Sequence, residues 1–388
     1  MKYRTFGRLG FSPSALGFGA MRLPVLRSEE TGALDFSRID KPAATEMLRW
    51  AIDHGVNYVD TAYNYHEDAS EQWLGEALAD GYRERVKVAT KMPAWKVERA
   101  SDFDRFLNEQ TERLGGAPDF YLLHSLTGES WRKVHGFGVL AWAERALAEG
   151  RFSAFGFSFH DEYPVFEEIV DAGLGLWSFC QIQLNYMDTQ HQAGLRGLEY
   201  AAERGLGVVV MEPIRGGQLA KEPPRVREIW DSASVRRSPS EWALQWVWDH
   251  PEVSLLLSGM STLQQVQENV AAAERSGPGG LSAEERMLVA RAHDAFRAGM
   301  VVSCTGCRYC SPCPQGVNIS RILEIYNDAH IYDDLRRQRL FYSWLDEAAR
   351  ADRCTGCGEC ETRCPQLLEV TEWLRRAHAL LGAEEAEK

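Results

Sequence analysis

Short apolar runs alternate with longer amphipathic stretches from about residue 12 to residue 275. The longer stretches have the period of helices, and capping-box patterns at Ser238, Ser261 and Ser282 predict where three of them begin. The short runs have the length and residue content of strands: Ser14–Gly19, Asn57–Thr61, Val86–Lys91, Phe120–His124, Phe152–Ser158, Phe179–Asn185, Gly207–Met211 and Val253–Ser258. Eight strand–helix alternations over about 270 residues predict a (β/α)8 TIM barrel in the α/β class, with an open doubly wound sheet as the alternative.

The pattern changes after the eighth alternation. The stretch 274–285, "ERSGPGGLSAEE", reads as a linker because glycine, proline and polar residues cluster in it. We therefore expect a barrel domain over 1–280, a linker and helix over 281–299, and a small domain over 300–388. Residues 319–351 have helical periodicity and no hairpin signal, so this domain should be mainly α-helical.

Charge and hydropathy exclude two classes of protein. The 388 residues carry a net charge of −13 and no Lys/Arg-rich face, which disfavours nucleic acid as a partner. Residues 1–10 have no apolar core of a signal peptide, and no apolar run approaches the length of about eighteen residues needed for a membrane span. We therefore expect a cytoplasmic protein in a reducing compartment, where closely spaced cysteines bind metal more often than they pair as disulfides.

Eight of the nine cysteines lie in two short runs, while Cys180 stands apart and is expected to be a small buried hydrophobe. Each run has the form C-x2-C-x2-C followed by a fourth cysteine and a proline. A structural zinc site is the alternative, although zinc usually takes two C-x2-C pairs. The runs are Cys304, Cys307, Cys310 and Cys313, and Cys354, Cys357, Cys360 and Cys364.

These runs resemble those of two-cluster bacterial ferredoxins, and the segment between them resembles the α-helical ferredoxin type. The resemblance implies two [4Fe–4S] clusters, each held by three cysteines of one run and the last cysteine of the other. One departure stands at Ser311 and Pro312, which are two residues where the standard run has three before its last cysteine. The implied ligand sets are Cys304, Cys307, Cys310 and Cys364 for one cluster, and Cys354, Cys357, Cys360 and Cys313 for the other.

Four polar residues follow the first strands of the predicted barrel. Asp60, Lys91 and His124 end three strands, and Tyr65 lies five residues beyond Asp60. The carboxyl ends of barrel strands meet on one face, where active sites are found. With "NYVDTAYNYHEDASEQWLGEAL", "VATKM", "YLLHSL", "GRFSAFGFS" and "VQENV", this set resembles the aldo-keto reductase family over about residues 1–275.

The resemblance assigns a role to each residue of this tetrad. Tyr65 would protonate the carbonyl oxygen, and Lys91 would lower the pKa of Tyr65. Asp60 would keep Lys91 charged and oriented, and His124 would orient and polarise the carbonyl.

The resemblance also implies NAD(P)H as a cofactor, with an altered nucleotide site. Ser158 and Gln181 fall where the family holds the nicotinamide carboxamide, but Phe159 replaces the asparagine usual after that serine. Met211 stands at the position of a stacking aromatic, and Asn269 is retained.

Gly259 and Gln265 stand where basic residues usually clamp a 2′-phosphate, so the preference for NADPH should be weak unless another cation, such as Arg215, serves. The expected substrate pocket consists of Trp95, His160, Asn185 and Tyr186, which follow strand ends and could equally be packing at the rim.

Together these features predict an iron–sulfur oxidoreductase that reduces, or forms, a carbonyl on a small carbonyl or alcohol substrate. The clusters would relay electrons, and a redox carrier protein would dock near residues 300–370. Two alternatives stay open: an ordinary NAD(P)H-dependent aldehyde or ketone reductase with purely structural clusters, and a redox-sensing or binding module without turnover.

Overall fold

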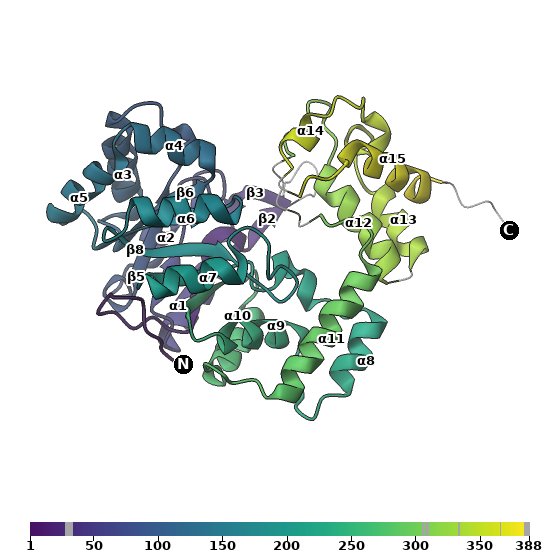
Figure 1. Ribbon diagram of the computed structural model, residues 1–388, viewed down its shortest axis with the longest axis horizontal. Coiled ribbons are helices and arrows are strands. Elements are labelled where there is room, and N and C mark those ends of the chain that lie inside the picture. Colours follow the sequence, from purple (N-terminus) through teal and green to yellow (C-terminus); the bar gives the residue numbers. More distant parts are fainter. Residues whose placement is uncertain (28–33, 305, 307–309, 333, 365, 384–388) are drawn as a thin grey trace. The chain divides into compact units, whose positions relative to one another are not determined.

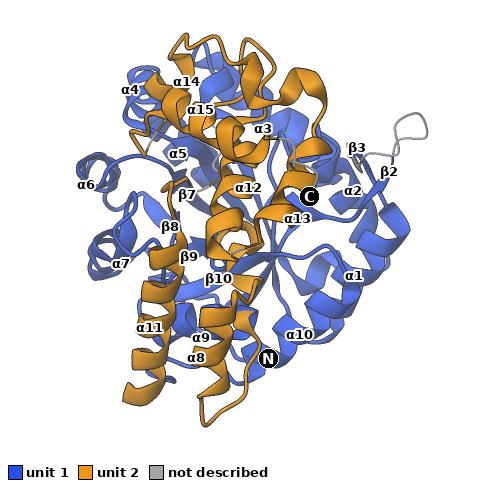
Figure 2. Ribbon diagram, turned by 90° about the vertical axis from the view of Figure 1, so that its right-hand side faces the viewer, with its two compact units in different colours: residues 1–214, 240–282 blue, residues 215–239, 283–388 orange. Residues whose placement is uncertain are grey.

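The computed structural model describes the chain except residues 28–33, 305, 307–309, 333, 365 and 384–388. The described chain divides into two compact units (Figure 2). Unit 1 comprises residues 1–214 and 240–282, and unit 2 comprises residues 215–239 and 283–388. Residues 215–239 therefore belong to the same unit as the cysteine runs, although they lie between two strands of the barrel in the sequence.

Unit 1 is built on a closed barrel of eight parallel strands, which confirms the predicted fold (Figure 1). The strands follow one another around the barrel in chain order, and β1 closes it by pairing with both β4 and β10. Their bounds are β1 Leu16–Gly19, β4 Tyr58–Asp60, β5 Lys87–Met92, β6 Phe120–Leu126, β7 Ala154–Phe159, β8 Trp177–Gln183, β9 Gly207–Met211 and β10 Val253–Gly259.

The α-helices of unit 1 are the amphipathic stretches between the strands, and their apolar faces pack on the barrel. The last of them begins at Leu263, and its N-cap is Thr262, one residue after the predicted Ser261; the Thr262 side chain accepts a hydrogen bond from the Gln265 backbone. The helices are α1 Lys41–Asp53, α2 Ser70–Ala77, α3 Ser101–Leu114, α4 Gly128–Gly136, α5 Val139–Ala148, α6 Tyr163–Ala172, α7 Gly194–Glu203, α9 Pro239–Asp249 and α10 Leu263–Glu274. Of α9, all residues after Pro239 lie in unit 1.

One end of the barrel is closed by Phe6. Its ring lies 5.4 Å from the ring of Phe179 and 5.6 Å from that of Phe120, at the amino ends of the strands. Gly207 at the start of β9 leaves the space that this ring fills, because a Cβ there would lie 2.2 Å from it. The opposite, carboxyl end of the barrel is where polar side chains can meet a substrate.

A two-stranded antiparallel sheet, which was not predicted, follows the first barrel strand. It pairs β2 (Val25–Arg27) with β3 (Leu34–Ile39). β2 has three residues, and polar or charged residues interrupt β3, so neither has the apolar run by which the barrel strands were found.

Unit 2 is mainly helical, as predicted for the residues around the cysteines. Its core is an apolar cluster that includes Ile322, Leu323, Ile325 and Leu374. Its helices are α8 Pro224–Asp231, α11 Ala283–Gly299, α12 Ile319–Ile331, α13 Leu335–Ser343, α14 Glu359–Thr362 and α15 Val370–Leu381, with short 3₁₀ turns η4 Arg215–Ala220, η5 Glu347–Ala349 and η6 Ala351–Arg353.

Buried Asn327 on α12 holds the chain that enters the first cysteine run. Its Oδ1 accepts from the backbone nitrogens of Val301 and Val302 at 3.1 and 2.8 Å, and its Nδ2 donates to the Val302 carbonyl at 2.7 Å. None of the described helices combines the length and the apolar character that crossing a membrane requires.

Candidate active site and cysteine pocket

The structure brings Asp60, Tyr65 and Lys91 together at the carboxyl ends of adjacent strands. Lys91 on β5 is 1% exposed, and its Nζ donates to Asp60 Oδ1 at the end of β4. The same Nζ donates to the Thr61 carbonyl at 2.7 Å and lies 3.4 Å from the Oη of Tyr65. One buried ammonium thus connects a carboxylate to a phenol.

The fourth member, His124 on β6, lies beside Tyr65. The two rings are 5.8 Å apart at their centroids and nearly perpendicular. Within the residues that the structure describes, the buried Nδ1 of His124 has no hydrogen-bond partner.

Burial and the neighbouring charges set the protonation of this group. Burial acts to lower the pKa of Lys91, but the attraction of Asp60 and Tyr65 outweighs it, and the pKa is raised. Burial raises the pKa of Asp60, against the opposing effect of Lys91. Lys91 therefore stays an ammonium at neutral pH.

The sequence led us to expect a lowered pKa for Tyr65 because of Lys91. The pKa is instead raised, so that expectation is wrong. Burial raises the pKa of Tyr65 above 10, and the attraction of Lys91 only partly offsets that rise. The phenol consequently holds its proton at neutral pH. For His124, burial first, and then the charges of Lys91 and His160, lower the pKa well below 6.5, so its imidazole is neutral.

A buried polar network holds the strand that carries Lys91. Glu71 on α2 is fully buried and accepts from Thr90 Oγ1 and from Gln110 Nε2, each at 2.5 Å. Gln110 Nε2 also donates to the carbonyl of Lys91 at 3.0 Å. Arg113 lies 3.2 Å from the Glu71 carboxylate and balances its charge. The end of β5 is thereby fixed by side chains that sequence reasoning did not select.

The predicted nucleotide residues lie at or beyond strand ends, with different partners. Ser158 on β7 accepts from the Ser125 backbone at 2.7 Å, and Gln181 on β8 lies near Asp60, whose charged form it stabilises. In the described part of the chain, the buried Oε1 of Gln181 has no partner. Asn269 donates to the Ser258 hydroxyl at 3.1 Å.

The expected phosphate clamp has a different arrangement from the family pattern. The Oε1 of Gln265 accepts from the backbone of Ser261 at 2.8 Å, so this side chain serves the start of α10. At Gly259, a Cβ would lie 3.1 Å from the aliphatic carbons of Arg22, whose stem crosses this position. Arg215 belongs to unit 2, and its side chain donates there to Gln218 and to the carbonyl of Cys304.

Two charged residues near the predicted nucleotide position were missed in the sequence. Arg22 follows β1, and its guanidinium lies 3.5 Å from the carboxylate of Glu212. Glu212 directly follows Met211 at the end of β9, in a left-handed backbone conformation with φ of 56°. Its negative charge acts to raise the pKa of Tyr65. Arg22 and Glu212 each follow a barrel strand in the sequence, and this position was the signal by which they could have been found.

The four expected pocket residues divide into two kinds. Trp95 lies 5.2 Å from His124 between ring centroids, and His160 is close enough to His124 to affect its charge. Burial lowers the pKa of His160 to about 4, which keeps this ring neutral as well. Asn185 instead holds a turn, because it accepts from Met187 and Asp188 and donates to the Glu212 carbonyl at 3.1 Å. Tyr186 is buried at 3% exposure.

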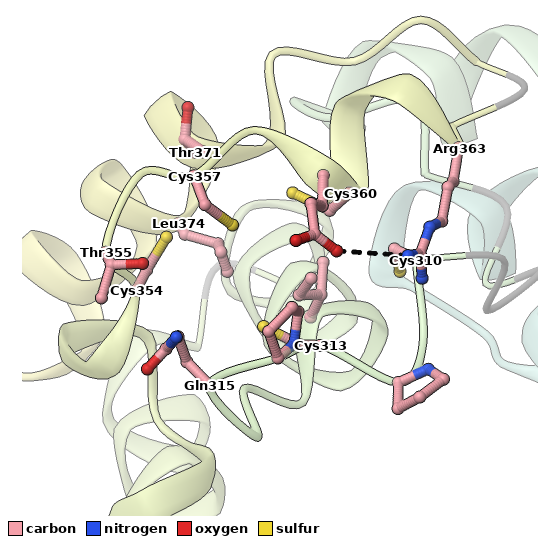
Figure 3. Close-up of a pocket in the computed structure, with 14 residues that line it drawn as sticks. Cys310, Cys313, Gln315, Cys354, Thr355, Cys357, Cys360, Arg363, Thr371 and Leu374 are labelled. Atoms are coloured by element: carbon pink, nitrogen blue, oxygen red, sulfur yellow. Dashed lines mark hydrogen bonds and ion pairs between the residues drawn. The ribbon is translucent and has the colours of Figure 1, made fainter.

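In unit 2 one pocket is lined by five cysteines of both runs, and Figure 3 shows their side chains. Four of them, Cys313, Cys354, Cys357 and Cys360, are the ligand set expected for the second cluster. The fifth, Cys310, belongs to the other set. Cys304 and Cys364 pack against the apolar core of the same unit, while Cys307 lies outside the described residues.

No disulfide joins the described cysteines of the pocket. Among the described residues, no three His, Cys, Asp or Glu side chains are gathered as the ligands of a single metal ion would be. Cys180 on β8 is fully buried, and burial raises the pKa of its thiol, as expected for a small apolar side chain.

Comparison with known proteins identifies two regions of the chain. Residues 15–277 match the aldo/keto reductase family, and residues 303–368 match the 4Fe-4S dicluster domain. The chain belongs to the aldo/keto reductase family and is an oxidoreductase that carries an iron–sulfur domain of the dicluster type.

Individual relatives resemble mainly the barrel. The chain is 26% identical over 300 residues to L-galactose dehydrogenase of Arabidopsis thaliana, covering 70% of this chain and 88% of the relative. It is 28% identical over 267 residues to the methylglyoxal reductase YeaE of Escherichia coli, covering 64% and 84%. Among solved structures, the holo form of the aldo-keto reductase AKR11C1 from Bacillus halodurans has a TM-score of 0.62 at 24% identity, covering 75% of this chain and 96% of that chain.

An aldo-keto reductase from Klebsiella pneumoniae in complex with NADPH has a TM-score of 0.59 at 22% identity, covering 76% and 96%. At these identities the solved structures show the fold.

Proposed function

We propose that this protein reduces a carbonyl group on a small substrate, or oxidises the corresponding alcohol, with Tyr65 as the proton donor. The observation that carries the proposal is the buried ammonium of Lys91, bound to Asp60 and 3.4 Å from Tyr65 Oη. Reduction places a hydride on the carbonyl carbon and a proton on its oxygen. Tyr65 is protonated at neutral pH, and its conjugate base would form beside a permanent positive charge.

His124 would orient the substrate, and Lys91 would supply the fixed positive charge beside Tyr65. The neutral imidazole of His124 lies beside Tyr65 and can donate a hydrogen bond to the carbonyl oxygen, which orients it toward Tyr65. Asp60 keeps Lys91 in place and charged. Trp95 lies beside His124 and would pack against the substrate, whose chemical identity beyond a small carbonyl or alcohol is open.

The residues at the ends of β7 and β8 fit a nicotinamide. The buried Oε1 of Gln181 has no hydrogen-bond partner among the described residues, so it could accept from the N–H of a carboxamide. Ser158 lies on the neighbouring strand. When bound, NAD(P)H would supply the hydride. The solved relative from Klebsiella pneumoniae in complex with NADPH supports this assignment.

The cysteine pocket fits an iron–sulfur cluster by the chemistry of its donors. Cys313, Cys354, Cys357 and Cys360 line one space, and thiolates of four cysteines are the usual ligands of a [4Fe–4S] cluster. Cys304, Cys307, Cys310 and Cys364 would hold the second cluster. When bound, each cluster can exchange one electron, so a pair could store the two electrons of one carbonyl reduction. We further propose that a redox carrier protein exchanges electrons with unit 2.

The test is anaerobic purification, an iron determination, and titration with NADH and NADPH while the absorbance of the clusters is followed. Two clusters require about eight iron atoms per chain. Bleaching of cluster absorbance by a nicotinamide, or by a reduced carrier followed by recovery on addition of a carbonyl substrate, supports the relay. A chain without iron, or without any carbonyl or alcohol turnover, would contradict the proposal.

A further inference from the structure

Arg215 is a buried cation at an unusual backbone position. It is 4% exposed, and its φ of 50° is left-handed, as are those of the two glycines that follow. A buried guanidinium and a left-handed non-glycine residue both cost free energy, and such residues are kept where surrounding contacts require them. Arg215 is the first residue of the segment 215–239, which belongs to unit 2.

The contacts of Arg215 lead to the first cysteine run. Its Nη1 donates to Gln218 Oε1 at 2.6 Å, and its Nη2 donates to the carbonyl of Cys304 at 3.4 Å. Cys304 is the first cysteine of the run and a ligand of one cluster in the proposed function. The Arg215 charge is therefore held at the backbone of one proposed ligand of that cluster, within one unit.

One helix, α12, fixes both partners of this contact. Lys221, six residues after Arg215, donates to Asp328 at 2.7 Å and to Glu324 at 3.4 Å, both on α12. Asn327 on the same helix binds the backbone of Val302, two residues before Cys304. The two chain segments are thus attached to a common support, which keeps Arg215 and Cys304 in a defined relation.

The cysteine pocket is lined by Cys310 of the first set and by the four cysteines of the other set, and its cation is more exposed than Arg215. Arg363 lines it, but its side chain is 46% exposed and pairs with Glu359 at 3.2 Å (Figure 3). A charge in contact with water acts more weakly on its neighbours than a buried one. Arg363 directly precedes Cys364 of the first set, so the buried charge that distinguishes this set is that of Arg215 at Cys304.

On the basis of the proposed function, we infer that Arg215 is a positioning residue that raises the reduction potential of the cluster held by Cys304, Cys307, Cys310 and Cys364. Reduction adds one electron to a centre that is already negative through its thiolate ligands. A fixed positive charge stabilises the reduced form more than the oxidised form, and hydrogen bonds around the ligands act in the same direction. Because an arginine keeps its charge at physiological pH, the effect is permanent.

The consequence is a direction for electrons within unit 2. An electron on the cluster of Cys313, Cys354, Cys357 and Cys360 would pass to the cluster beside Arg215, so that the first becomes oxidised and the second reduced by one electron. No further reactant is needed for that exchange.

The experiment is a redox titration of the full-length holoprotein, followed by electron paramagnetic resonance, in the wild type, Arg215→Gln and Arg215→Lys. In Arg215→Gln, one of the two one-electron transitions should move to lower potential. At a fixed potential the ratio of reduced to oxidised cluster should fall about tenfold, which is about 59 mV for a one-electron couple. The other transition should not move, and Arg215→Lys should stay close to the wild type.

Arg236→Gln is the matched control, because Arg236 lies in the same segment, is 71% exposed and pairs with Asp231 on the surface. It should leave both transitions in place. If Arg215→Gln loses iron, the test is made with Arg215→Lys. This variant keeps the positive charge, so it should keep both clusters and their wild-type potentials.

Unmoved transitions in an iron-loaded Arg215→Gln, an equal shift of both transitions, or an Arg215→Lys protein that shifts fully or loses iron would overturn the inference. A wild-type protein without clusters would instead contradict the proposed function itself.

Discussion

The Nζ of Lys91 lies 3.4 Å from the Oη of Tyr65, and both atoms come from the carboxyl end of the barrel. Lys91 cannot move away without leaving the buried carboxylate of Asp60 unpaired, which is costly. The relationship is therefore built into the fold, and the first two predictions depend on it.

Replacing Tyr65 with phenylalanine should remove carbonyl reduction while the iron content stays unchanged. The hydroxyl is the proposed proton donor, and loss of a positioned acid typically lowers the rate by about 100-fold to 10,000-fold. Turnover with a confirmed substrate and iron per chain are the two measurements. Tyr63→Phe is the control, because the Tyr63 hydroxyl donates to Glu109 at 3.1 Å. Wild-type turnover in Tyr65→Phe would exclude Tyr65 from the mechanism.

Replacing Lys91 with methionine should move the alkaline limb of kcat/KM to higher pH. The proton donor must be protonated, so activity is present below the pKa of Tyr65 and lost as the pH rises through it. Burial raises that pKa, and Lys91 partly opposes the rise. Removing the ammonium removes the opposition, so the pKa rises further, and kcat/KM should also fall by about 100-fold or more.

The pH dependence of kcat/KM measures this effect, and Lys87→Met is the control. Lys87 begins the same strand, is 43% exposed and pairs with Asp119 at 2.8 Å. A limb that moves to lower pH in Lys91→Met would contradict the assigned electrostatics.

Affinities for NADPH and NADH should lie within about tenfold of each other. Gly259 has no side chain and Gln265 is engaged at the start of α10, so two charge-assisted contacts to a 2′-phosphate are missing. At about 1.5–3 kcal/mol each, their loss removes two or more orders of magnitude of preference. Binding of both nucleotides by calorimetry tests this.

Arg22 is a cation near Gly259 that could bind the 2′-phosphate and restore a preference for NADPH. Its stem crosses Gly259, although its guanidinium lies 3.5 Å from Glu212. A strong preference for NADPH that disappears in Arg22→Gln would show that Arg22 serves as the phosphate clamp.

The clusters should carry electrons and not only stabilise unit 2. Cys310→Ala should lower the turnover that chemically reduced clusters support. Cys310 lines the pocket and is one of the four proposed ligands of the first cluster. Turnover is measured with a chemical reductant and with NAD(P)H. Cys180→Ala is the control for the loss of a thiol, since Cys180 lies inside the barrel wall. Full NAD(P)H-dependent activity in Cys310→Ala, with clusters that no carbonyl substrate can oxidise, would make the clusters structural.

The apolar runs were sufficient to predict the barrel, because each strand buries both faces and is nearly continuous in apolar residues. Each of the eight predicted runs overlaps a barrel strand, with strand ends that lie up to two residues beyond the run. β2 and β3 could not be found in this way, because polar and charged residues interrupt their apolar pattern. The start of α10 was predicted one residue early because Ser261 and Thr262 are both good caps, and only the local backbone decides between them.

The site was predictable where residue type and strand position coincide, as for Asp60, Lys91 and His124. Contacts between residues far apart in sequence could not be predicted, such as Arg22 lying across Gly259 or Gln110 holding the Lys91 carbonyl. The direction in which the pKa of Tyr65 is shifted could not be predicted from the sequence either, because it depends on the burial of the phenol. Nor did any pattern assign residues 215–239 to the unit of the cysteines.

The chain passes between its two units three times, after residues 214, 239 and 282. The iron–sulfur unit is therefore not a removable appendage. A protein truncated after Ser282 would keep α8 but lose its partner α11, leaving Val226, Ile229 and Trp230 without their cover. Such interleaving makes loss of one unit a folding problem for the other, which favours keeping both in a single polypeptide.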